Sequence, residues 1–282
     1  MQQTENRVGE SDLGRPDFYR RTLEILNEAE VPFLVGGAFA FASYTDVKRD
    51  TKDFDLFVRE RDIPAALEAV HRAGFLTEIT HPHWLAKVFH EDESVDLIYR
   101  SGNGLSEVDN LWFARAVPGR ALGMDILLCP VEETIWTKAF IMERERFDGA
   151  DVMHLIRSCA AGLDWERLVH LFGDHWRVLL AHITLFGFVY PSHRNLIPSR
   201  TMQLLLRRLE HESSAEPSDE RICRGTLLSR AQYRKDIDEW GYRDARLRPD
   251  GTMTSEEIQQ WTDAIEGEAI RNERRRPFTG HR

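Results

Sequence analysis

The first part of the chain combines helical and strand-like hydrophobic patterns. Apolar residues recur at helical spacing over 17–30, and short apolar runs typical of strands follow. The predicted strands cover 31–35, 53–58, 75–80, 84–90, 94–100 and 121–130. Two further helices are predicted over 38–44 and 63–74, and Asp62 is the expected N-cap of the second. The pattern therefore predicts a β-sheet flanked by helices.

After Pro130 the pattern becomes almost entirely helical. The predicted helices cover 132–144, 148–158, 164–171, 175–186 and 199–211. A polar linker follows over 212–220, and Thr254 with Glu257 offers a capping box near the end of the chain. We predict a disordered segment over 1–16, a sheet domain over 17–130, a helical domain over 131–211, and a linker with a charged helical tail over 212–282. The expected fold class is α+β.

Two aspartates interrupt the apolar strand DFDLFV. A carboxylate in such a strand is costly unless a hydrogen bond, a basic partner or a metal ion compensates it. Residues two apart in a strand point to the same face, so Asp53 and Asp55 project together. Asp96 lies in the later strand SVDLIYR. If that strand lies beside the first, three carboxylates converge, and such a set can bind one or two Mg²⁺ ions.

Gly36 and Gly37 separate a predicted strand from a predicted helix. Backbone amides of a glycine pair, together with a helix N-terminus, can approach the oxygens of a phosphate group. Each motif alone has an ordinary structural explanation, because glycine pairs are common in turns and DxD occurs at strand edges. The ordered set of GG, helix, DFD and a later strand aspartate is more specific. It predicts a site for a nucleoside triphosphate with its magnesium ion.

The segments LVGG, TKDFDLFV and VDLIY resemble the nucleotidyltransferase superfamily of the DNA polymerase β type. Within it, the chain looks most like the AbiEii-type toxins and the minimal nucleotidyltransferases of bacteria. The resemblance implies a mixed β-sheet flanked by helices and followed by a helical region. It also implies Mg²⁺-dependent transfer of a nucleoside monophosphate from an NTP, such as ATP, to a hydroxyl acceptor, with release of pyrophosphate.

The resemblance also implies roles for individual residues. Gly36 and Gly37 would bind the triphosphate, and Asp53 and Asp55 would ligate magnesium. Asp96 would complete the metal site and help to deprotonate the attacking hydroxyl. The spacing between Gly37 and Asp53 is longer than usual in the family, which indicates an enlarged loop. The segment beyond 212 matches nothing in the family pattern, so the acceptor stays open.

Several basic residues are further candidates for the nucleotide site. By the resemblance, Lys138 lies where the family often has a lysine near the phosphates, and Asp151 matches an aspartate of the AbiEii branch. Thr51 and Lys52 precede the DxD motif and either contact phosphate or belong to a solvated loop. Lys87 alternates with Phe89 and faces either the site or solvent.

The segment HPHW raises the question of a second metal site. His81, His83 and His90 lie near Asp96 in the sequence, but their spacing is not that of a recognised zinc site. A loop at the rim of the substrate site is the preferred interpretation of these histidines.

Composition narrows the class of protein. The chain has 282 residues, of which 42% are hydrophobic and 30% charged, and its formal net charge is −10. That charge argues against coating of nucleic acid through bulk electrostatics. The three cysteines are far apart, and the N-terminus has no apolar signal core. We therefore expect a cytoplasmic bacterial protein without a membrane span.

Two functions remain open from the sequence. The first is the enzyme, with an RNA end, a protein or a small molecule as acceptor. The second is a catalytically silent module of the same fold that binds a nucleotide or a partner, as in a toxin–antitoxin or phage-defence pair. The arrangement of Asp53, Asp55 and Asp96 around a cleft is the observation that separates them.

Overall fold

The computed structural model describes residues 15–48 and 53–274, which fall into two compact units. Unit 1 contains the described residues up to Thr80, together with Leu85–Tyr99 and Val108–Pro130. Unit 2 contains His81–Trp84, Arg100–Glu107 and the described residues from Val131 onward. Each unit is described by itself.

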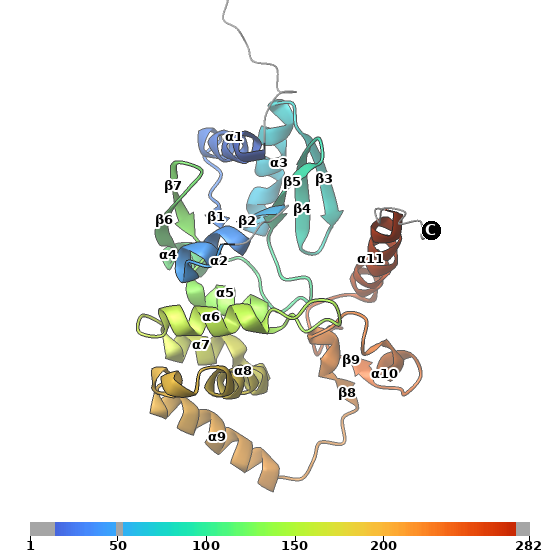
Figure 1. The fold of residues 1–282 in the computed structure, drawn as a ribbon. Helices are drawn as coiled ribbons and strands as arrows, with labels where there is room; N and C mark the ends of the chain where they lie inside the picture. The colour runs from blue at the N-terminus through green and yellow to red at the C-terminus, as the bar shows by residue number, and fades with distance from the viewer. Residues whose placement is uncertain (1–14, 49–52, 275–282) are drawn as a thin grey trace, which may run out of the picture. The chain divides into compact units, whose positions relative to one another are not determined.

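Unit 1 is built on a mixed sheet whose seven strands lie in the order β3-β4-β5-β2-β1-β7-β6 (Figure 1). The strands are β1 (Leu34–Val35), β2 (Asp53–Phe57), β3 (Leu76–His81), β4 (Leu85–His90), β5 (Glu93–Ile98), β6 (Val117–Ala121) and β7 (Met124–Leu128). The helices are α1 (Arg15–Glu28), α2 (Gly37–Thr45), α3 (Ile63–Arg72) and α4 (Asn110–Ala114). In the centre of the sheet, β2 runs parallel to β5 and antiparallel to β1, while β1 runs parallel to β7.

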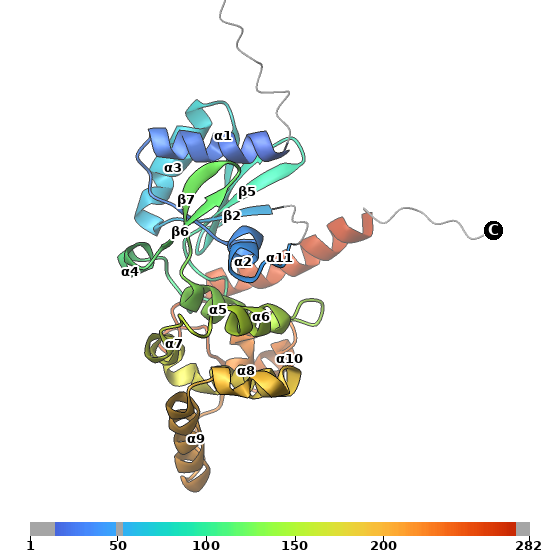
Figure 2. The same cartoon turned by 60° about the vertical axis from the view of Figure 1, so that its left-hand side comes forward.

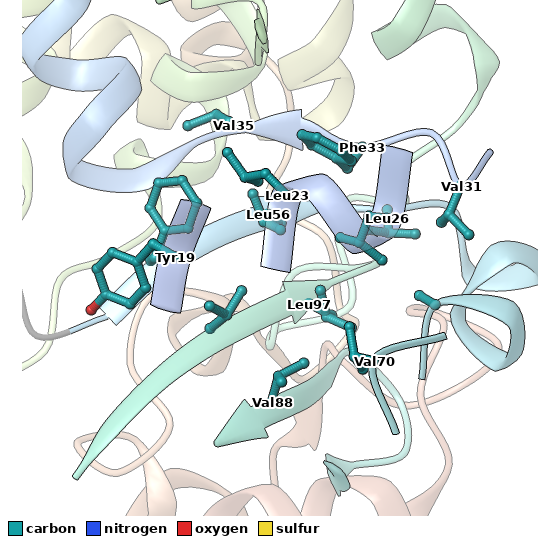
Figure 3. Packing of buried hydrophobic residues seen from close by; sticks show 14 of the residues in the cluster. Tyr19, Leu23, Leu26, Val31, Phe33, Val35, Leu56, Val70, Val88 and Leu97 are labelled. Carbon is teal, nitrogen blue, oxygen red and sulfur yellow. The ribbon is translucent and has the colours of Figure 1, made fainter. Parts of the chain in front are cut away.

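Helices α1 and α3 supply the hydrophobic cover of this sheet (Figure 2). Leu23 and Leu26 of α1 lie over Leu56 of β2 and Leu97 of β5, all fully buried (Figure 3). Fully burying one such side chain contributes roughly 1.5–3 kcal/mol. Because side chains alternate along a strand, burial of Leu56 on the helix-covered face directs Asp53 and Asp55 to the opposite face.

Two local predictions for unit 1 are confirmed only in part. The strand predicted over 31–35 is reduced to β1, because Pro32 has no amide hydrogen to donate to a ladder. Asp62 occupies the N-cap position of α3 as predicted, but its side chain makes no capping hydrogen bond and instead accepts one from Nε of Arg59 at 2.6 Å.

The structure also contains elements that the hydrophobic pattern missed. Helix α4 is capped by Asp109, which accepts hydrogen bonds from the amides of Leu111 and Trp112. Strand β6 has the sequence VPGRA, in which proline and glycine hide the strand pattern. It lies at the edge of the sheet, where a residue without an amide hydrogen is tolerated.

Unit 2 is mainly helical (Figure 1). Its helices are α5 (Val131–Ala139), α6 (Gly149–Cys159), α7 (Trp165–Phe172), α8 (Trp176–Val189), α9 (Ser199–Ser214), α10 (Arg234–Asp238) and α11 (Ser255–Arg274). A short parallel pair joins β8 (Ile222–Cys223) to β9 (Arg243–Asp244). The α+β class, a mixed sheet with helices followed by a helical region, is confirmed. Among the described helices, none is both long and apolar enough to cross a bilayer.

Tertiary contacts changed two predicted helices of unit 2. The helix predicted to reach residue 144 ends at Ala139. It ends there because Met142 and Phe147 pair across a tight reversal of the chain. In addition, the Glu143 carboxylate accepts a hydrogen bond from the Arg230 amide. The tail beyond residue 220 is not simply helical, since it contains β8 and β9. The capping box is confirmed, with reciprocal hydrogen bonds of 2.7 and 3.2 Å between Thr254 and Glu257.

Candidate active site

The parallel pairing of β2 and β5 places carboxylates side by side. Asp55 is in register with Asp96, and Asp53 is in register with Ser94. Paired residues of neighbouring strands point to the same face of a sheet. The three aspartates therefore share the face opposite α1 and α3, as expected if the two strands were neighbours.

The glycine turn lies directly against Asp55. Gly37 has φ +53°, and a Cβ built on it would meet Oδ2 of Asp55 at 1.7 Å. The amide of Gly36 donates a hydrogen bond to the backbone oxygen of Asp55 at 2.9 Å. Only glycine combines this positive φ with so close an approach of a carboxylate. The start of α2 and the Asp55 side chain are thus held together in unit 1.

Gly36 has a separate packing role. It precedes α2 as the N-cap residue, and a Cβ on it would meet the Phe57 ring at 2.3 Å. The N-terminus of a helix carries unpaired amides and a partial positive charge, which favour an anion. The turn brings this end of α2 to the strand that carries Asp53 and Asp55.

Asp53 has a hydrogen-bond donor on the neighbouring strand. The hydroxyl of Ser94 donates to Oδ1 of Asp53 at 3.2 Å. The sequence prediction missed Ser94, although its position two residues before Asp96 in the same strand places both on one face. Ser94 is a site residue that the strand alternation alone could have indicated.

The negative charge of the buried Asp96 carboxylate is compensated by a basic side chain. Lys87 of β4 is in register with Asp96, and its Nζ donates to Oδ1 of Asp96 at 2.7 Å. Burial raises the pKa of Asp96, the charge of Lys87 lowers it, and the charge of Asp53 raises it, with a net rise. Of the two orientations left open for Lys87, the structure shows the one that faces the aspartates.

The donor set suits a divalent cation only in part. Asp53 and Asp55 offer hard oxygen ligands on one face, and the missing side chain of Gly37 leaves room for the Asp55 carboxylate. Within residues 15–48 and 53–274, no three Asp, Glu, His or Cys side chains are grouped so that they could hold a metal ion. The residues thus fit an ion bound through Asp53 and Asp55, while Asp96 is engaged by Lys87.

Lys138 lies in unit 2, in a buried ion cluster. Its Nζ contacts Oδ2 of Asp148 at 3.0 Å and Oδ2 of Asp151 at 2.8 Å. Arg146 also donates two hydrogen bonds to Asp148. Burial alone would raise the pKa of Asp148, but Arg146 and Lys138 outweigh it and lower the pKa below its ordinary value. The role of Lys138 in nucleotide binding stays a prediction.

The other sequence candidates fall into two groups. Thr51 and Lys52 lie outside the described residues. His81 and His83 belong to unit 2, where their rings lie 5.1 and 5.9 Å from that of Trp261. These two histidines belong to an aromatic cluster. Among the described residues they are part of no group that could hold a metal ion.

Comparisons with known proteins find similarity among solved structures at low sequence identity. No family model and no curated protein matches this chain. Among solved structures, the antibiotic-resistance factor ANT(2'')-Ia is 15% identical with a TM-score of 0.41, covering 59% of this chain and 95% of that one. The lincosamide antibiotic adenylyltransferase LnuA is 14% identical with a TM-score of 0.36, covering 51% of this chain and 96% of that one.

A third solved structure is JHP933 from Helicobacter pylori. It is 13% identical with a TM-score of 0.33, covering 71% of this chain and 96% of that one. Likeness at these values does not extend to substrate or mechanism. The function of this chain must therefore be argued from its own residues.

Proposed function

We propose that this chain is a nucleotidyltransferase of the DNA polymerase β-like superfamily. It transfers a nucleoside monophosphate from an NTP to a hydroxyl acceptor and releases pyrophosphate, with Mg²⁺ as cofactor. One observation carries the proposal: Asp55 lies against the Gly37 turn on one side and is in register with Asp96 on the other. A phosphate-binding turn and paired carboxylates are the two halves of an NTP–magnesium site.

The binding half of the site uses the start of α2. The turn at Gly36 and Gly37 and the helix N-terminus receive the triphosphate oxygens, while Asp53 and Asp55 hold the divalent ion. When bound, the ion neutralises charge on the phosphates and on the leaving pyrophosphate. Thr51, Lys52 and Lys138 are proposed as further contacts to the phosphates.

The transfer half uses Asp96. The acceptor hydroxyl oxygen attacks the α-phosphorus, the bond from that phosphorus to the bridging oxygen breaks, and pyrophosphate leaves with the electron pair. Asp96 accepts the hydroxyl proton, and its burial, which raises its pKa, favours that role. The family resemblance also implies that Asp96 is a third ligand of the metal ion.

The proposal does not specify which molecule accepts the nucleotide or what the enzyme does in the cell. An RNA end, a protein side chain and a small molecule all carry suitable hydroxyls, and the net charge of −10 disfavours a large RNA. We infer a cytoplasmic bacterial enzyme with the AbiEii-type and minimal nucleotidyltransferases as relatives. Linkage of its gene to that of an antitoxin would identify a toxin–antitoxin pair.

The test is transfer of label from α-³²P-labelled NTPs to components of a cell lysate with Mg²⁺. Wild type is expected to label one class of acceptor, and Asp55→Asn to label none. Asp125→Asn serves as the control, because Asp125 is an exposed aspartate on β7. Equal labelling by wild type and Asp55→Asn would overturn the proposal.

A second candidate function is a nucleotide-binding module without turnover. The Lys87–Asp96 ion pair favours it, because it engages the carboxylate that would act as base. This candidate predicts Mg²⁺-dependent binding of ATP or GTP in calorimetry with no labelled product. The enzyme predicts both binding and product.

A further inference from the structure

Lys87 occupies an unusual position for a lysine. It lies on β4, the second strand from one edge of the sheet, and its side chain is 21% exposed while that of Asp96 is 12% exposed. Lysine is seldom buried to this degree unless it is paired. At 2.7 Å the contact is a short, charge-assisted hydrogen bond. The pair is therefore a built feature of the site and not a solvated surface contact.

The position of this ammonium group matters for metal binding. A divalent ion shared by Asp53, Asp55 and Asp96 would lie on the face that Lys87 also occupies. Two cations bound to one carboxylate repel each other, and the repulsion is strong where water is largely excluded. The ion would have to displace Lys87 from a partner that compensates its burial.

The remaining carboxylates are arranged differently. Asp53 is exposed and accepts a hydrogen bond from the neutral Ser94 hydroxyl. Asp55 lies against Gly37, whose lack of a side chain leaves room for the Asp55 carboxylate. These two aspartates are two residues apart on one strand and share a face, so they can hold one ion without Asp96.

We propose that Lys87 is a positioning residue that takes the place of a second divalent ion. The site then binds a single Mg²⁺ or Mn²⁺ through Asp53 and Asp55, and Lys87 holds the Asp96 carboxylate in place. This inference rests on the proposed function, because it states which cations occupy the metal site of that proposed enzyme. It predicts a metal count, which can be measured without any knowledge of the acceptor.

The test counts Mn²⁺ ions per chain by electron paramagnetic resonance, on free protein and with one equivalent of α,β-methylene ATP. Wild type is expected to bind one ion in both states. Lys87→Arg keeps a cation beside Asp96 and should also bind one ion. Lys87→Gln removes the cation and should bind two. Asp96→Asn should also bind one ion, with weaker affinity, because one negative charge is removed from the shared face.

The outcomes separate this inference from the proposed function. Two ions in wild type, or one ion in a folded Lys87→Gln protein, would overturn the inference and leave the proposed function standing. No Mn²⁺ bound by wild type in either state would overturn the proposed metal site itself. If circular dichroism shows that Lys87→Gln is unfolded, the ion counts of wild type and Lys87→Arg decide: one ion in both supports the inference, and two ions in either refutes it.

Discussion

The Cα of Gly37 lies against the carboxylate of Asp55 so closely that a methyl group there would meet Oδ2 at 1.7 Å. The contact joins the turn that opens α2 to the strand that carries Asp53. It makes the position of a candidate metal ligand depend on the absence of a side chain 18 residues earlier in the chain.

Gly37→Ala should therefore damage the site more than the fold. The positive φ costs an alanine about 1–2 kcal/mol, and the added Cβ must also displace Asp55. Gly123→Ala is the matched control, because Gly123 has φ +78° and nothing within 4 Å of a built Cβ. Gly37→Ala should lose at least as much stability as Gly123→Ala in urea denaturation, whereas only Gly37→Ala should lose Mn²⁺ binding. Retained binding in Gly37→Ala would make the glycine purely structural.

Asp55→Asn should lower nucleotidyl transfer by about 100-fold or more, the order of effect seen when one electrostatic contact to a transition state is removed. The metal-free protein should keep its melting temperature or gain slightly, because one of three carboxylates on a common face is neutralised. Asp53→Asn should behave in the same way. A fall in the melting temperature of both metal-free variants, with nucleotide binding retained, would show that the aspartates serve the fold instead.

Lys138→Met should destabilise the protein by at most about 3–5 kcal/mol, because Asp151 loses a buried cationic partner while Asp148 keeps Arg146. Lys235→Met is the control, since Lys235 is 60% exposed and pairs with Glu239 at 3.4 Å. An exposed pair of this kind contributes about 0.3–0.5 kcal/mol. Urea denaturation measures both changes. Similar small losses in the two variants would free Lys138 for a role confined to nucleotide binding.

Stability should fall in acid partly through Asp244. Burial raises the pKa of this carboxyl, but hydrogen bonds from Arg246 outweigh burial, so the pKa lies below its ordinary value of 3.8. The unfolded chain then binds the proton more readily than the folded chain. The contribution is fully present above pH 3.8 and is lost as pH falls below it toward the folded pKa.

The check is chemical denaturation between pH 5 and about pH 2.5 on wild type and Asp244→Asn. The variant should be less stable at pH 5 and less dependent on pH below 4, because the titrating group is gone. Asp250→Asn is the control, because Asp250 pairs with the more exposed Arg243. Equal pH slopes in wild type and Asp244→Asn would contradict the assignment.

Local pattern determined much of this protein. Strand alternation in DFDLFV is enough to place Asp53 and Asp55 on one face, and the spacing of Thr254 and Glu257 is enough to predict the capping box. Both depend on residues two or three positions apart, where backbone geometry relates the side chains directly.

The tertiary structure determined the contacts between residues that lie far apart in the sequence. The register of Asp55 with Asp96, the choice of Lys87 as partner of Asp96, and the end of α5 at Ala139 each depend on which elements pack together. Sequence pattern alone does not set strand register, because every register that keeps the apolar face buried satisfies the same alternation. The aspartates were therefore predictable from the chain, whereas the cation beside Asp96 was decided by the pairing of β4 with β5.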